Sequence, residues 1–118
     1  TNEVIEIVEF LQEKNIHVIL STYPNLITKE NIKEHELLFM ESLRFTVELS
    51  FDGMIDASKS ADSIMFDIAR IMEIGIVDCN SNIPKNTTYF ADNVHLTNKG
   101  AEIVSGLLAE YLLENDQN

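Results

Sequence analysis

The sequence predicts an α/β protein with a parallel sheet, on three observations. A near-continuous apolar, β-branched run at residues 16–20 is typical of a strand covered on both faces, as in parallel sheets. An amphipathic helical pattern at 1–14 precedes this run, and further helical patterns follow it. The order helix, strand, turn, helix is that of a doubly wound fold. At 118 residues, the chain is one domain at most, spanning 1–118.

The first helix and strand rest on local signals. Apolar residues share one face of the helix at 1–14, and the strand at 16–20 ends before Pro24, because proline cannot donate to a sheet ladder. In doubly wound folds, the loops after the carboxyl ends of the strands carry the site. We therefore expect the loop at 21–25 to lie near a functional site.

The middle of the chain is predicted as a long helix and a loop. One helical pattern extends from 28 to 49, with apolar residues along one side and charged residues on the others. Residues 50–60 have no periodicity and contain the turn signal Asp52-Gly53, so we predict a loop there.

A helix and a second strand are predicted next. Ser60 can cap a helix at 61–74, and Gly75 can end it in the left-handed conformation. A short strand at 76–79 follows, and a polar loop at 80–88 leads to the last part of the chain.

The stretch before the last helix carries the clearest chemical pattern. Asp92 and His95 are three residues apart in a short polar turn, and Thr97 can cap the next helix. An imidazole placed there can accept a proton on one ring nitrogen while the other donates to the carboxylate, as in a nucleophilic triad. We predict Asp92 and His95 as a catalytic pair, with the imidazole turned toward Asp92 and not into solvent. The apolar stripe of the helix consists of Val104, Leu107, Leu108, Tyr111 and Leu112.

This stretch resembles the last sequence block of the SGNH (GDSL-type) esterase and lipase family. The likeness rests on residues 92–96, on the following Lys99-Gly100 and on the amphipathic helix behind them. The resemblance implies that Asp92 and His95 supply the acid and base of a Ser-His-Asp triad. It also implies a nucleophilic Ser in an upstream Gly-Asp-Ser motif, and a Gly and an Asn that complete the oxyanion hole.

The sequence departs from the pattern of that family: it has no Gly-x-Asn-Asp, and it opens on a predicted helix where the family has its first strand. It contains no Gly-Asp-Ser, and the four glycines, Gly53, Gly75, Gly100 and Gly106, do not lie in such a context. We therefore expect the chain to be the C-terminal part of an SGNH hydrolase-like domain. The resemblance implies a three-layer α/β/α, flavodoxin-like fold with a parallel sheet, whose N-terminal strands are absent from this chain. The substrate would be a small acyl ester, hydrolysed once the missing residues are supplied.

Composition excludes several other classes. A net charge of −12 argues against nucleic-acid or anionic-membrane binding, since either needs a basic patch. The chain contains no apolar run long enough to span a bilayer and no signal-peptide pattern. A single cysteine, Cys79, excludes an internal disulfide framework. We expect no cofactor and no metal, because Asp92 and His95 offer two ligands and a zinc site wants at least three from the protein.

Three other residues have side chains that can act in catalysis, but the residues around them in the sequence indicate other roles. His17 lies within an apolar strand, which indicates a structural role. Ser21 follows a strand but lacks the flanking glycines of a nucleophile elbow. Cys79 at a strand end is interpreted as a small buried hydrophobe.

Two alternatives stay open at this point. In the first, the chain is a non-catalytic α/β interaction module in which Asp92 and His95 have a structural role. They stabilise the start of the last helix through an Asx-type turn. In the second, it is an unrelated flavodoxin-like binding domain with an acidic surface. In every case, two strands are too few for a stable parallel sheet, so we expect a second chain or copy to cover the open edge.

Overall fold

The protein has a mixed α/β fold, seen in a computed structural model that describes residues 2–45 and 48–115. Position 1, positions 46–47 at the end of the predicted helix 28–49, and positions 116–118 lie outside the described residues. The elements follow in the order α1 (Asn2–Glu13), β1 (Ile19–Ser21), α2 (Lys29–Glu34), α3 (Glu36–Leu43), α4 (Phe51–Ile71), β2 (Gly75–Val77) and α5 (Asn98–Glu114).

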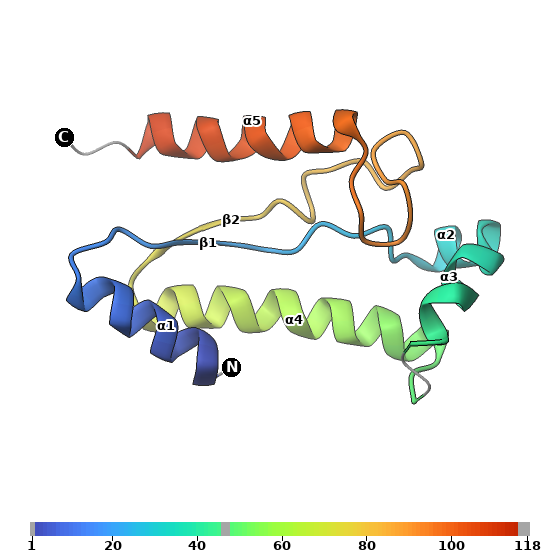
Figure 1. Cartoon of the computed structure of the whole chain (residues 1–118), viewed down its shortest axis with the longest axis horizontal. Coiled ribbons are helices and arrows are strands. Elements are labelled where there is room, and N and C mark those ends of the chain that lie inside the picture. Colours follow the sequence, from blue (N-terminus) through green and yellow to red (C-terminus); the bar gives the residue numbers. More distant parts are fainter. Residues whose placement is uncertain (1, 46–47, 116–118) are drawn as a thin grey trace.

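The two strands form a parallel pair with helices on both sides. β1 and β2 pair in the register Ile19 to Gly75, Leu20 to Ile76 and Ser21 to Val77. Figure 1 shows α5 on one side of the pair and α1 and α4 on the other. α4 contacts both strands, and α5 contacts β2. The predicted α/β class and parallel pairing are therefore confirmed. None of the described helices combines the length and the apolarity that crossing a bilayer requires.

The main core lies beyond the carboxyl ends of the strands. Leu26 follows β1, Phe39 lies on α3, and Phe90 follows β2; each side chain is almost completely buried. These three pack in one cluster with Ile32, Met54, Ile55 and Ile83. Because its members come from the loops after both strands and from the helices that follow β1, this cluster holds those loops in place.

The predicted continuous helix at 28–49 is wrong in two respects, because the helix breaks at His35 and α3 already ends at Leu43. His35 has φ −122° and ψ 42°, and α2 and α3 meet there. Thr28 caps α2 by accepting a hydrogen bond from the Asn31 amide. Ile32 and Phe39 are both buried in the core on either side of the break. Since a seven-residue spacing suits one straight helix as well as two short ones, the apolar pattern could not reveal the break.

The predicted loop at 50–60 is also wrong, because α4 begins at Phe51. Ser50, and not Ser60, is the cap, and its hydroxyl accepts from the Gly53 amide. Asp52 lies in the first turn, where a carboxylate is favourable near the positive end of the helix dipole. The Asp-Gly turn signal is therefore part of a helix start.

The end of α4 differs from the prediction as well. Glu73 adopts the left-handed conformation with φ 53°, whereas Gly75 has an ordinary φ and begins β2. Gly75 is required for space, since a Cβ there would lie 2.0 Å from the hydroxyl oxygen of Tyr111 on α5.

The strands are shorter and less buried than the sequence predicts. β1 begins at Ile19, and both Ile16 and His17 are exposed before it. The residues of β1 are only half-buried, because the strand pairs with β2 alone among the described residues. Helices lie on both sides of the pair, as a strand covered on both faces requires, but the open edge of β1 leaves its residues only partly buried.

The last helix begins as predicted. Thr97 caps α5 by accepting from the Gly100 amide at 3.2 Å. Gly100 is buried against the preceding loop, where a Cβ would lie 2.1 Å from the carbonyl oxygen of Tyr89. Of the predicted apolar stripe, Val104, Leu107 and Tyr111 are half-buried, whereas Leu108 and Leu112 are exposed.

We predict that Gly100→Ala destabilises the chain by about 1–3 kcal/mol, because the added methyl meets a backbone oxygen that cannot move alone. Gly106 on the same helix is the matched control: nothing lies within 4 Å of its added Cβ, and the helix propensity of alanine raises stability there by about 1 kcal/mol. Urea unfolding of both variants measures the difference. Equal effects of the two substitutions would contradict the close packing of α5 on the loop.

Candidate functional site

The predicted pair lies in a closed turn just before α5. Phe90 and Leu96 form an isolated antiparallel bridge. Two backbone hydrogen bonds flank this bridge. The Ala91 amide donates to the His95 carbonyl oxygen at 2.8 Å, and the Thr97 amide donates to the Tyr89 carbonyl oxygen at 3.0 Å. Since Phe90 is buried in the core, the turn is anchored at its base.

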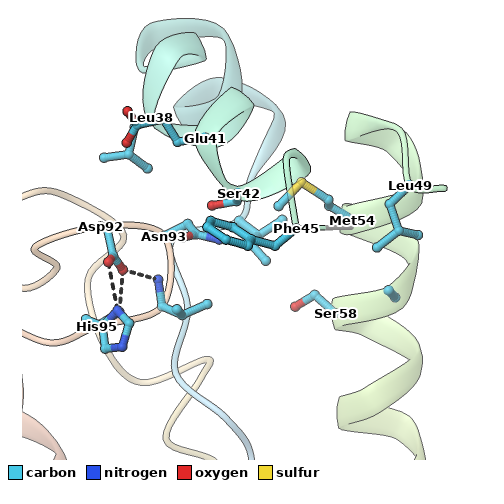
Figure 2. Close-up of a pocket in the computed structure, with 13 residues that line it drawn as sticks. Leu38, Glu41, Ser42, Phe45, Leu49, Met54, Ser58, Asp92, Asn93 and His95 are labelled. Carbon is cyan, nitrogen blue, oxygen red and sulfur yellow. Dashed lines mark hydrogen bonds and ion pairs between the residues drawn. The ribbon is translucent and has the colours of Figure 1, made fainter. Parts of the chain in front are cut away.

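The Asp92 carboxylate organises this turn. Its Oδ1 accepts hydrogen bonds from the backbone amides of Val94 at 2.9 Å and His95 at 2.7 Å. Its Oδ2 lies 2.7 Å from Nδ1 of the His95 ring. Figure 2 shows the ring held against the carboxylate. One oxygen therefore shapes the backbone while the other orients the imidazole.

The two parts of the prediction for His95 have different outcomes. The ring is turned toward Asp92, as predicted. However, its side chain is 74% exposed, so the expectation that it avoids solvent is wrong. Among residues 2–45 and 48–115, none hydrogen-bonds to Nε2, so this nitrogen is open to an incoming group.

The environment of Asp92 favours its ionised form. Partial burial alone would raise the pKa of this carboxyl group. The hydrogen bonds from the Val94 and His95 amides and from the His95 ring outweigh that effect, and the pKa is lowered from its usual value. Asp92 is therefore an anion at neutral pH.

A cavity of about 500 Å³ adjoins the pair. Figure 2 shows Met54 and Ser58 of α4 across this cavity from Asp92 and His95. The lining is mostly apolar and comprises Ile27, Leu38, Glu41, Ser42, Phe45, Leu49, Met54, Ala57, Ser58, Asp92, Asn93, Val94 and His95. Pockets of this size accept small organic ligands.

The loop after β1 lies against the turn, as predicted for 21–25. The amide of Leu26, the next residue, donates to the Asn93 carbonyl oxygen at 2.8 Å. The side-chain amide of Asn25 donates to the Ser58 hydroxyl at 2.9 Å, which joins this loop to α4 at the cavity. The carboxyl end of β1 therefore positions part of the site.

A polar network that the sequence did not reveal joins the carboxyl ends of both strands. The Thr22 hydroxyl donates to the Asp78 carboxylate at 2.8 Å and accepts from the Asn80 amide at 2.9 Å. The Asn80 side chain donates to Asp62 of α4 at 2.7 Å. The one available signal was that Thr22 and Asp78 each directly follow a strand.

Lys85 is the cation of this network. Its Nζ donates to the Asn25 carbonyl oxygen at 2.6 Å and to the Asn80 side-chain oxygen. Burial lowers the pKa of Lys85 to about 8, although the nearby Asp62 and Asp78 carboxylates favour its charged form. This amine therefore loses its proton at a lower pH than an ordinary lysine does.

The other candidate residues do not join the pair. The Ser21 hydroxyl donates to the Thr22 carbonyl oxygen at 2.8 Å, and Ser21 does not line the cavity with His95. His17 is exposed before β1, and Cys79 is completely buried, as its interpretation as a small hydrophobe predicted. In the part of the chain that the structure describes, no three His, Cys, Asp or Glu side chains converge in a way that could hold a metal ion.

The lowered pKa of Asp92 predicts a pH-dependent contribution to stability. Because the folded pKa lies below the unfolded value of about 3.9, the anion stabilises the fold above that pH, and the effect is lost as pH falls through the folded pKa. We expect Asp92→Asn to lower the free energy of unfolding at neutral pH, and we expect the difference to shrink as pH falls below about 4 and to vanish only below the folded pKa. Urea unfolding across this range measures it, with Asp56→Asn on the exposed side of α4 as control. A difference that does not change with pH would contradict the role of the charge.

The comparisons with known proteins concern the fold. The sequence matches no protein-family model and no curated protein. Among solved structures, the chain is similar to a protein from Bacteroides fragilis that is provisionally described as an acylhydrolase, with a TM-score of 0.66 and 19% sequence identity. The similarity covers 96% of this chain and 50% of the other, so this chain spans half the length of that neighbour. At this identity, the likeness shows that the two chains share a fold, and it shows nothing of the reaction.

Proposed function

We propose that this chain is the C-terminal part of an SGNH (GDSL-type) serine ester hydrolase domain. In this proposal, Asp92 and His95 are the acid and base of a Ser-His-Asp triad. The nucleophilic Ser and the oxyanion-hole donors come from sequence outside these 118 residues, since no Gly-Asp-Ser occurs within them. The complete domain then has the three-layer α/β/α, flavodoxin-like arrangement, of which this chain contributes two strands.

The observation that carries the proposal is the contact of 2.7 Å between Asp92 Oδ2 and His95 Nδ1. A carboxylate on Nδ1 favours the tautomer in which Nδ1 carries the proton and the lone pair is on Nε2. His95 also belongs to the residues that line the apolar cavity. The exposure of the ring suits a base whose nucleophile belongs to another segment.

The mechanism follows from this geometry. His95 Nε2 takes the proton from the Ser hydroxyl as its oxygen attacks the ester carbonyl, and then gives that proton to the leaving alcohol. Water, deprotonated by the same nitrogen, hydrolyses the acyl-enzyme to the acid and the free Ser. Asp92 holds the ring and stabilises the imidazolium in both halves of the reaction.

The structural alternative has its own supporting observation. Asp92 Oδ1 accepts two backbone amides in an Asx-type turn, and this would close the loop without any chemistry. In that case, the chain is an interaction module, and the His95 ring contributes little beyond the turn. The ring of His95 therefore distinguishes the two hypotheses better than Asp92 does.

We predict no hydrolysis of p-nitrophenyl butyrate above background by the 118-residue chain, because a base without a nucleophile and oxyanion donors cannot form an acyl-enzyme. The polypeptide that completes the fold should restore hydrolysis. In the completed protein, Asp92→Asn should lower turnover by about 10⁴-fold, and His95→Ala should abolish it.

The controls separate the outcomes. Turnover by the chain alone that disappears in Ser21→Ala would place the nucleophile in β1 and contradict the proposal. Hydrolysis by the completed protein that is unchanged in His95→Ala would favour the interaction module. Lys59→Ala, an exposed position on α4 outside the cavity, should have no effect in either protein.

We also propose that the rest of the hydrolase domain covers the exposed apolar side chains near the strand pair. Ile7 and Phe10 on α1 and Leu112 and Leu113 on α5 are all more than half exposed, Leu113 to 81%. Large apolar groups on two separate helices are costly in water and favour a partner.

We therefore predict that the isolated chain self-associates at micromolar concentration or binds the dye ANS strongly, because its apolar groups have no cover. Sedimentation and dye fluorescence measure the two effects. Leu113→Glu with Phe10→Glu should reduce both. A stable monomer that binds no dye would count against a missing half.

A further inference from the structure

We propose that the cavity beside His95 is the acyl-chain site, and that it selects an uncharged, medium-length apolar chain while disfavouring carboxylates. This inference rests on the proposed ester hydrolase function. It adds the length and the charge of the acyl group, which neither the triad geometry nor the structural neighbour supplies.

Apolar side chains from several segments line the cavity. Met54 belongs to α4, Leu38 to α3, and Val94 to the turn itself; Ile27, Phe45 and Leu49 complete the wall. Figure 2 shows Leu49 and Met54 on one side and His95 on the other, with the Phe45 ring between them. A volume of about 500 Å³ is more than an acetyl group would fill. An alkyl chain that extends away from His95 would bury its methylenes against this wall.

The charged side chains that line the cavity are of one sign. Glu41 and Asp92 contribute carboxylates, and no Lys or Arg is among the described lining residues. The chain as a whole carries a net charge of −12. Like charges at short range in a partly desolvated site repel, and surrounding anions strengthen the effect. A neutral ester can therefore enter, whereas a carboxylate in the same position is destabilised.

This selectivity suits hydrolysis. The substrate ester is neutral, and hydrolysis with one water gives an alcohol and an acid that loses its proton at neutral pH. The resulting anion lies close to Asp92 and Glu41 and is expelled. The same carboxylates thus favour release of the product over its retention.

The test measures binding by the 118-residue chain, so it needs no nucleophile. NMR titration with methyl butanoate, methyl hexanoate and methyl octanoate should show affinity rising about fourfold per added methylene, the equivalent of ~0.8 kcal/mol for each buried CH₂. Octanoate at neutral pH should bind at least tenfold more weakly than methyl octanoate.

Ala57 provides the blocking variant. It lies on the exposed side of α4 and lines the cavity, so Ala57→Phe fills the space without disturbing the core. Binding of methyl octanoate should fall by at least tenfold. Ala109→Phe, an exposed alanine inside α5 and away from the cavity, is the matched control and should bind as the unmodified chain does. Phe45→Ser, at another exposed position, should weaken binding by removing part of the apolar wall.

Three results would overturn the inference: affinity independent of chain length, octanoate binding as tightly as its ester, or unchanged binding by Ala57→Phe. Each is distinct from failure of the proposed function. If the chain binds esters as described but the completed protein is inactive, the acyl site is supported and the triad is contradicted. If the completed protein is active but the 118-residue chain binds no ester, the triad is supported and the acyl site is contradicted.

Discussion

The chemistry of this chain depends on one carboxylate with two tasks. Asp92 Oδ1 closes the turn by accepting two backbone amides, and Oδ2 holds the His95 ring at 2.7 Å. Three donors on one carboxylate stabilise its anion and leave the imidazole with a defined orientation. The structural and the catalytic interpretations therefore share a single geometry. They differ only in what approaches Nε2.

The position of this turn is decided by packing beneath it rather than by the sheet. Each strand has three residues, too few to hold long loops in place by itself. Leu26 and Phe90 instead bring the loops after β1 and β2 into one core, and the Leu26 amide bonds directly to Asn93. A general base needs its geometry held to within a fraction of an ångström, and buried side chains in a close-packed core provide that.

The polar network behind the core has a second effect. Lys85 joins the Asn25 and Asn80 segments while Asp62 and Asp78 lie nearby. Two carboxylates lie close to one half-buried amine and offset its positive charge, so this region adds no net positive charge to an acidic protein. The net negative charge therefore acts at the exposed surface and at the cavity, where Glu41 and Asp92 lie. Such a distribution favours neutral ligands over anions.

Local features of this protein were determined by the sequence alone. The three-residue separation of Asp92 and His95, the Thr97 cap and the apolar runs of the two strands are local features, and a sequence pattern records them. Only the tertiary structure decided where the helix breaks between α2 and α3, at His35, and where α4 starts, at Phe51. It also decided that β1 is only partly buried. The tertiary structure alone also decided the network that joins Asn25, Asn80 and Lys85. It likewise decided the cavity, whose lining residues come from four segments between positions 27 and 95. These features depend on which distant groups exclude water from one another, and no spacing along the chain encodes that.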